Sequence, residues 1–146
     1  MTPDLIFQIC SGIALLGWIT WLISSPFFPD ADKFLIGIVI TLLAIVYAWI
    51  IVTSFNPSDA KKFGSLDGVM ILFQNKTLVT AGWVHYLAFD LMVGIWIKRN
   101  SLIHDIPNWL IIPCLLFTFM LGPVGLLFYL LIRYIRTGNY FAANYN

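Results

Sequence analysis

The positions of the charged residues constrain this chain more than any other feature of its sequence. The 146 residues include eight Lys and Arg and seven Asp residues, and no Glu. Between the charges lie four apolar stretches of roughly twenty residues, enough for a helix to cross a hydrocarbon core about 30 Å thick. These stretches cover residues 5–24, 34–55, 78–97 and 109–132. Because they do not alternate as barrel strands do, we predict an all-α integral membrane protein: one domain, residues 1–146, with four transmembrane helices.

The composition excludes several other classes of protein. The chain is 60% hydrophobic and 10% charged, whereas soluble proteins carry about 25% charged residues. A soluble enzyme and a disordered tail are therefore excluded. A net charge of +1 without a basic patch also excludes nucleic acid as a partner. Asp4 stands where a signal peptide carries basic residues, so we expect the first stretch to be a retained helix among membrane lipids.

The basic residues predict an orientation for a chain with four spans. The N-terminus, the connection 56–77 and the C-terminal tail would then share one side of the membrane. That side would hold five basic residues and the opposite side three. The five are Lys61, Lys62, Lys76, Arg133 and Arg136, and the three are Lys33, Lys98 and Arg99. The positive-inside bias therefore predicts that both termini are cytoplasmic.

The connection between the second and third stretches contains an apolar face at helical spacing. Phe63, Leu66, Met70 and Phe73 fall at positions that share one side of a helix. This pattern predicts a short amphipathic helix that lies in the membrane interface. The alternative is an ordinary polar loop with scattered apolar residues.

Small residues occur at helical spacing in the fourth stretch. Thr118, Gly122, Gly125 and Tyr129 share one face, and Pro123 is expected to bend the helix. Small side chains let two backbones approach, so this face is expected to pack on another helix. The alternative is a groove in which a flat ligand contacts Gly122, Gly125 and Tyr129.

The strongest candidate site lies in the third stretch. Asp90 is near its middle, where an ionisable residue costs at least about 2.5–3.5 kcal/mol and is a candidate for function. A helical wheel places His85, Trp83, Tyr86 and Phe89 on the same side as Asp90. We predict an acid–base pair, His85 and Asp90, in an apolar pocket walled by the three aromatic residues. The alternative is a hydrogen-bonded cluster that only fixes packing. The opposite face is apolar and consists of Val84, Leu87, Ala88, Leu91 and Ile95.

Metal binding has little support in the sequence. His104, the second of two histidines, follows the third stretch, whereas His85 lies within it. Cys10 and Cys114 fall inside apolar stretches, where small hydrophobic side chains are expected. No ligand spacing typical of zinc is present, and we predict neither a metal nor a cofactor.

Three blocks of the chain resemble one known family. The blocks are residues 63–70, 82–91 and 113–127. They resemble the abscisic-acid-deficient-four-like family, and the likeness extends to the length and span layout of the whole chain. Its plant members are chloroplast membrane proteins needed to form neoxanthin from violaxanthin. The resemblance implies a carotenoid-like lipid as ligand. This chain lacks the long N-terminal extension of the chloroplast members, so we expect it in a bacterial inner membrane.

The resemblance also implies a type of reaction. Converting an allylic epoxide to an allene requires a proton on the epoxide oxygen and loss of a proton from a nearby carbon. We assign these roles to His85 and Asp90, with Asp67 as a third group. A cofactor-free isomerase of carotenoid-like lipids is therefore the first hypothesis. A carotenoid- or retinoid-binding carrier and a structural accessory subunit are the alternatives, and so small a bundle is compatible with a homodimer.

Overall fold

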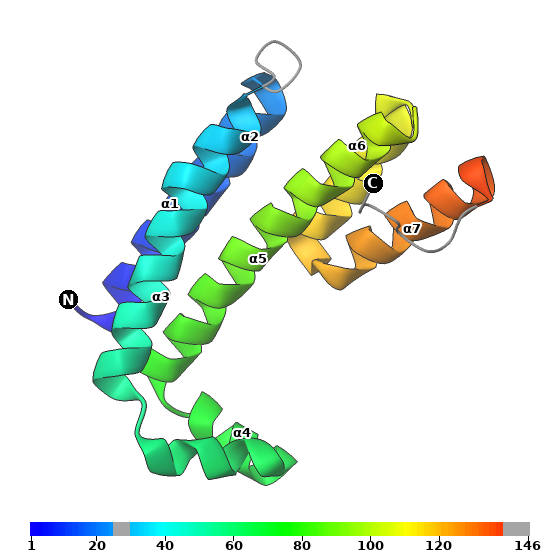
Figure 1. Ribbon diagram of the computed structural model, residues 1–146. Coiled ribbons are helices and arrows are strands. Elements are labelled where there is room, and N and C mark those ends of the chain that lie inside the picture. Colours follow the sequence, from blue (N-terminus) through cyan, green and yellow to red (C-terminus); the bar gives the residue numbers. More distant parts are fainter. Residues whose placement is uncertain (25–29, 139–146) are drawn as a thin grey trace. The chain divides into compact units, whose positions relative to one another are not determined.

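The computed structural model describes residues 1–24 and 30–138, and most of them are helical (Figure 1). The helices are α1 (Pro3–Ser24), α2 (Ala31–Phe34), the π-helix η1 (Leu35–Ile40), α3 (Thr41–Ser54), the 3-10 helix η2 (Pro57–Gly64), α4 (Leu66–Phe73), α5 (Lys76–Ile103), α6 (Asn108–Leu121) and α7 (Pro123–Thr137). The all-α prediction is confirmed for these residues. The chain forms two compact units, residues 1–88 and 89–146. Helix α5 contributes to both, and each unit is described by itself.

Within residues 1–24 and 30–138, three helices are long and apolar enough to cross a membrane. They are Pro3–Ser24, the continuous run Ala31–Ser54, and Lys76–Ile103, with 22, 24 and 28 residues. At 1.5 Å per residue each exceeds the thickness of the hydrocarbon core, about 30 Å. The first three apolar stretches therefore form helices of spanning length, as predicted for an integral membrane protein.

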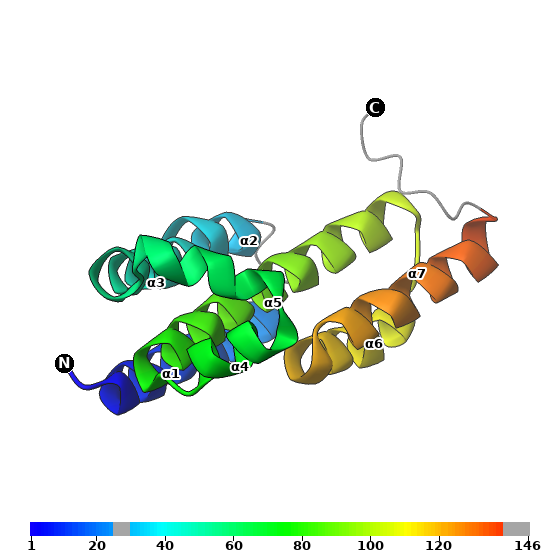
Figure 2. The same cartoon turned by 90° about the horizontal axis from the view of Figure 1, so that it is seen from below.

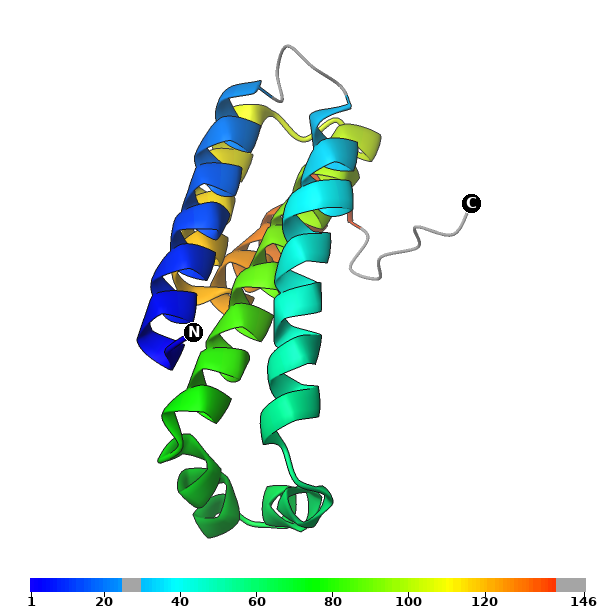
Figure 3. The same cartoon turned by 90° about the vertical axis from the view of Figure 1, so that its left-hand side faces the viewer.

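In the first unit, α1 contacts α2 and η1 (Figure 3). Gly17 makes this approach close, because a Cβ there would lie 3.2 and 3.3 Å from side-chain carbons of Val39 and Leu35. Farther along, Trp21 Nε1 donates a hydrogen bond of 2.5 Å to Asp32 Oδ1, and both side chains are buried. This hydrogen bond satisfies a carboxylate near the end of a span, where an unpaired charge is costly.

Short helices η2 and α4 cross the end of the first unit where α3 ends and α5 begins (Figures 1 and 3). The predicted helix through residues 63–73 is interrupted at Ser65, which is extended (φ −147°, ψ 152°) and accepts a 3.1 Å hydrogen bond from the Gly68 backbone N–H. The four predicted apolar side chains of this segment are 56–76% exposed. They are Phe63, Leu66, Met70 and Phe73. Their placement in the membrane interface stays a prediction.

Asp59 stabilises the start of η2 through two hydrogen bonds. Lys62 Nζ donates to Asp59 Oδ1 (2.8 Å), and the Asn56 backbone N–H donates to Asp59 Oδ2 (3.0 Å). The hydrogen bond from Lys62, followed by that from Asn56, holds the pKa of the Asp59 carboxyl below its ordinary value. The ionised form of Asp59 is therefore the one that fits this turn.

In the second unit, the fourth apolar stretch forms two helices where the sequence predicted one. Helix α6 ends at Leu121 and α7 begins at Pro123, with Gly122 between them at φ 42° and ψ −92°. The two helices pack against each other (Figure 2). A proline disfavours the helical conformation in the residue before it, and glycine adopts a positive φ without steric cost. The prediction of one continuous helix over 109–132 is therefore wrong, and a fourth span is not established.

Candidate functional site

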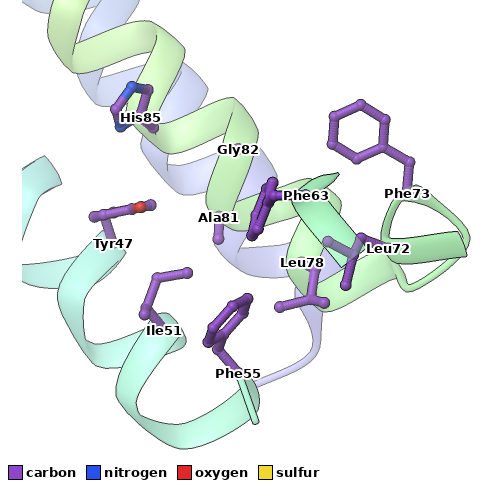
Figure 4. A pocket seen from close by; sticks show the side chains of 10 residues that line it. All are labelled: Tyr47, Ile51, Phe55, Phe63, Leu72, Phe73, Leu78, Ala81, Gly82 and His85. Carbon is purple, nitrogen blue, oxygen red and sulfur yellow. The ribbon is translucent and has the colours of Figure 1, made fainter. Parts of the chain in front are cut away.

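The first unit contains a cavity of about 360 Å³ between α3, the η2–α4 segment and the start of α5 (Figure 4). This volume lies in the range of small-molecule sites, about 300–1,000 Å³. The lining residues are Tyr47, Ile51, Phe55, Phe63, Leu72, Phe73, Leu78, Ala81, Gly82 and His85. The lining is therefore aromatic and aliphatic, with one imidazole and one phenol.

The imidazole and the phenol lie together at one end of the cavity (Figure 4). The rings of Tyr47 and His85 have centroids 5.3 Å apart and planes inclined by 54°. Aromatic side chains form the other part of the wall, where Phe55 and Phe63 have centroids 6.0 Å apart. The cavity thus combines a reactive polar end with an apolar body, and both polar groups can donate or accept a proton.

The polar end of the cavity is the end farther from the adjoining ends of α3 and α5. His85 lies about nine residues, or roughly 14 Å, along α5 from Lys76, and Tyr47 about seven residues before the end of α3 at Ser54. By contrast, Phe55 and Phe63 lie at or beyond the end of α3. Because α3 and α5 belong to helical runs of spanning length, we expect Tyr47 and His85 to lie farther from the membrane surface than Phe55 and Phe63.

Trp83 and Tyr86, predicted to wall the site, do not line this cavity, and Trp83 contacts α1 instead. Trp83 Nε1 donates a 2.9 Å hydrogen bond to Ser11 Oγ. The Trp83 ring lies 5.2 Å from that of Phe7 and 5.5 Å from that of Tyr86. Trp83 therefore joins α5 to α1, Tyr86 packs on Trp83, and the role of both as ligand contacts stays a prediction.

The face of α5 predicted to be purely apolar is its interior face. Val84, Ala88, Leu91 and Ile95 are buried, whereas His85 is exposed. Hydropathy cannot distinguish the lipid-facing side of a helix from the side packed against protein, because lipid and the protein interior are both apolar. Burial does not follow the predicted division of α5 throughout, because Asp90 of the predicted polar face is also buried and Leu87 of the apolar face is half-buried.

Asp90 belongs to the second unit and is 7% exposed. Its carboxylate lies against the turn between α6 and α7, because a Cβ on Gly122 would lie 2.6 Å from Asp90 Oδ1. Two other predicted site residues, Phe89 and Asp67, are exposed, with Asp67 in the first turn of α4. Of the predicted catalytic residues in the part of the chain that the structure describes, His85 is the one that lines the cavity.

The other predicted ligand contacts of the fourth stretch are occupied by protein atoms. A Cβ on Gly125 would overlap the Thr118 backbone nitrogen and hydroxyl and the Cys114 carbonyl oxygen. Tyr129 is fully buried, and its hydroxyl donates a 2.5 Å hydrogen bond to Asn100 Oδ1. These contacts favour the packing interpretation of this face over the ligand groove.

Sequence reasoning missed two residues that the structure makes prominent. Tyr47 lies within an apolar stretch without any charged neighbour, and a phenol in the middle of a span was the available signal. Arg133 was placed in the tail by its position, yet it is fully buried and donates a 3.2 Å hydrogen bond to Asn100 Oδ1. Its spacing of four residues from Tyr129, one helical turn, could have indicated the pair.

Comparison with protein families gives one match that covers most of the chain. The family model described as ABA DEFICIENT 4-like matches residues 5–129. The chain belongs to the ABA DEFICIENT 4-like family. This confirms the resemblance seen in the three sequence blocks, and membership of the ABA DEFICIENT 4-like family implies involvement in carotenoid metabolism. Comparison with curated proteins and with solved structures gave no match.

The matched range includes every residue that lines the cavity, and also Asp90 and Gly122. Within residues 1–24 and 30–138, no group of three or more His, Cys, Asp or Glu side chains is placed to hold a metal ion. Among the residues that line the cavity, His85 and Tyr47 carry the side chains that can donate or accept a proton.

Proposed function

We propose that this ABA DEFICIENT 4-like protein binds a carotenoid or related polyene lipid in the Tyr47–His85 cavity and isomerises it by acid–base chemistry. The observation that carries the proposal is an aromatic-lined cavity of about 360 Å³ with an imidazole and a phenol at one end. The proposal rests also on the family, whose membership implies carotenoid metabolism.

The direction of the cavity favours a polyene over an ordinary amphiphilic lipid. A phospholipid or fatty acid keeps its polar head in the interface and its chain in the hydrocarbon core. The cavity has the opposite polarity, because Tyr47 and His85 lie deeper than Phe55 and Phe63. A long apolar molecule with an oxygen function held inside the bilayer fits this arrangement, and its remaining length would extend into the surrounding lipid.

His85 is the acid–base group of the proposed reaction. In an epoxide-to-allene isomerisation, the epoxide oxygen gains a proton while its C–O bond breaks, and a neighbouring carbon loses a proton. The atoms balance without any co-reactant. The His85 imidazole delivers one proton and removes the other, and Tyr47, 5.3 Å away between ring centroids, orients the substrate oxygen by its hydroxyl. Asp90 and Asp67 are outside the lining of this cavity, and their catalytic roles stay sequence-based predictions.

The test is conversion of an epoxide-bearing carotenoid by protein reconstituted in lipid, followed by chromatography and mass spectrometry. His85→Gln is expected to reduce the rate by roughly 100- to 10,000-fold, the usual contribution of a general acid or base. His104→Gln is the matched control, because it removes the other histidine, which lies outside the cavity lining. Equal rates in His85→Gln and wild-type protein would contradict the catalytic role.

A carrier function is the second candidate, because eight of the ten lining residues lack an ionisable side chain. A carrier would retain pigment through purification and return it chemically unchanged after incubation. In that case His85→Gln would alter the affinity or the absorption spectrum of the pigment, and no product would form with wild-type protein.

A further inference from the structure

Helices α6 and α7 are each too short to cross a bilayer. They contain 14 and 15 residues, or roughly 21–23 Å at 1.5 Å per residue, against a hydrocarbon core of about 30 Å. One helix through both would be long enough, but the chain reverses at Gly122 and the two helices pack side by side (Figure 2). The fourth apolar stretch therefore has the length and shape of a hairpin.

Contacts within the second unit fix the depth of this hairpin along α5. Its turn, Gly122, lies against Asp90 near the middle of α5. Farther along α7, Arg133 and Tyr129 both donate to Asn100 Oδ1, close to the end of α5 at Ile103. From Gly122 to Arg133 is about 16 Å of helix, and from Asp90 to Asn100 about 15 Å. Helix α7 thus runs from the middle of α5 to its C-terminal end.

We propose that α6 and α7 form a re-entrant hairpin. It enters the bilayer on the side where α5 ends, turns at Gly122 beside Asp90 in the middle of the membrane, and returns to the same side. This proposal does not rest on the polyene function. It assigns Asp90 a structural task, which is to hold the tip of the hairpin.

Physical chemistry explains why a carboxylate lies at this tip. Helix ends leave backbone groups without intrahelical partners, and lipid cannot satisfy them. The Gly122 N–H donates to the Thr118 carbonyl (2.9 Å), and Pro123 has no N–H to satisfy. The N-terminal end of α7 is the positive end of its dipole, and the Asp90 carboxylate lies next to it. The one aspartate in the middle of α5 therefore has a role that requires no substrate.

The hairpin changes the expected orientation of the chain. With three crossings, the end of α7 lies on the side of the connection 104–107, opposite the η2–α4 segment. Arg133 and Arg136 move to that side, which then carries five basic residues against three. The side with five holds Lys33, Lys98, Arg99, Arg133 and Arg136, and the other holds Lys61, Lys62 and Lys76. The positive-inside bias now places the end of α7 in the cytoplasm and η2–α4 outside.

Labelling of introduced cysteines with a membrane-impermeant maleimide tests the hairpin in intact cells and in opened membranes. The native Cys10 and Cys114 are buried, so wild-type protein is the background control. Ala60→Cys, Asp105→Cys and Arg136→Cys introduce thiols at exposed positions in η2, after α5 and in α7. Leu121→Cys reports on the tip.

We expect Ala60→Cys to label in intact cells, and Asp105→Cys and Arg136→Cys to label together only after the membranes are opened. Leu121→Cys, although its side chain is 52% exposed in the protein, is expected to stay unlabelled in both because lipid surrounds it. Labelling of Arg136→Cys from the same side as Ala60→Cys would overturn the hairpin. Labelling of Leu121→Cys from the Ala60 side would overturn it as well.

Discussion

The Tyr47–His85 cavity and the turn beside Asp90 place two ionisable groups of the same helix in opposite surroundings. His85 is exposed and borders a cavity of about 360 Å³. Asp90 is buried, and its Oδ1 faces a glycine that leaves no space for a Cβ. We propose that an ionisable residue in a span belongs to a ligand site when it borders a cavity, as His85 does. When protein atoms enclose such a residue, as they enclose Asp90 at Gly122, the residue has a structural role in helix packing.

Gly125→Ala is expected to have the largest effect on stability. The new Cβ would overlap the backbone of Thr118 and the Cys114 carbonyl oxygen, so α6 and α7 must separate. Overpacking of this kind costs about 1–3 kcal/mol, and backbone overlap places Gly125→Ala at the upper end. Thermal unfolding in detergent measures it. Gly12→Ala in α1, where a Cβ meets nothing within 4 Å, is the control. Equal melting temperatures for the two variants would show that α6 and α7 are not tightly packed at Gly125.

The substitution Asp90→Asn is expected to distinguish most clearly between the Tyr47–His85 cavity and the turn beside Asp90. The amide keeps the size of the carboxylate but loses its charge beside the N-terminal end of α7, at a cost of about 1–2 kcal/mol. We expect a lower melting temperature and a rate of polyene conversion within a few-fold of wild type. A large loss of conversion at an unchanged melting temperature would instead make Asp90 a catalytic residue and contradict its role at the turn.

Acidification is expected to have the smallest effect on stability, and to act on η2, which contributes to the cavity wall. The folded protein holds the pKa of Asp59 below its value in the unfolded chain, so this carboxylate stabilises η2 at neutral pH. The stabilisation is lost as the pH falls through the folded pKa. Because η2 carries Phe63 of the cavity wall, amide protection in η2, corrected for the intrinsic pH dependence of hydrogen exchange, should fall at low pH before protection in α6 and α7 does. Asp59→Asn should show the faster exchange already at neutral pH. An unchanged η2 in that variant would show that Asp59 does not stabilise this turn.

The positions of the spanning helices could be predicted from the sequence, because hydropathy alone indicates which stretches are long and apolar enough to cross a membrane. The first three apolar stretches fall on the helical runs Pro3–Ser24, Ala31–Ser54 and Lys76–Ile103, although α5 continues past the predicted end at 97 through Lys98 and Arg99. The break at Gly122 was not predicted, because hydropathy continues through Gly122-Pro123 and proline alone also fits a bend. In the structure Gly122 has a positive φ, and the chain reverses there instead of continuing as a bent helix.

The candidate site was predicted in part. His85 was found because an imidazole in an apolar stretch is conspicuous. Tyr47 was missed because its pairing with His85 joins α3 to α5, and one sequence gives no distance between helices. The interior position of Val84 and Ala88 was missed for a related reason, since their apolar character suits lipid and protein equally.

The most direct test of the central claim is mass spectrometry of the lipid extracted from gently purified protein. Gly82 lines the cavity and a Cβ there meets nothing within 4 Å, so Gly82→Leu should fill the cavity without disturbing the backbone. Gly12→Leu is the matched control at an equally open position in α1. We predict a polyene lipid in the wild-type and Gly12→Leu extracts, and a roughly tenfold or greater loss in Gly82→Leu, equivalent to about 1.4 kcal/mol of binding. The same polyene content in all three proteins would contradict the assignment of this cavity as the ligand site.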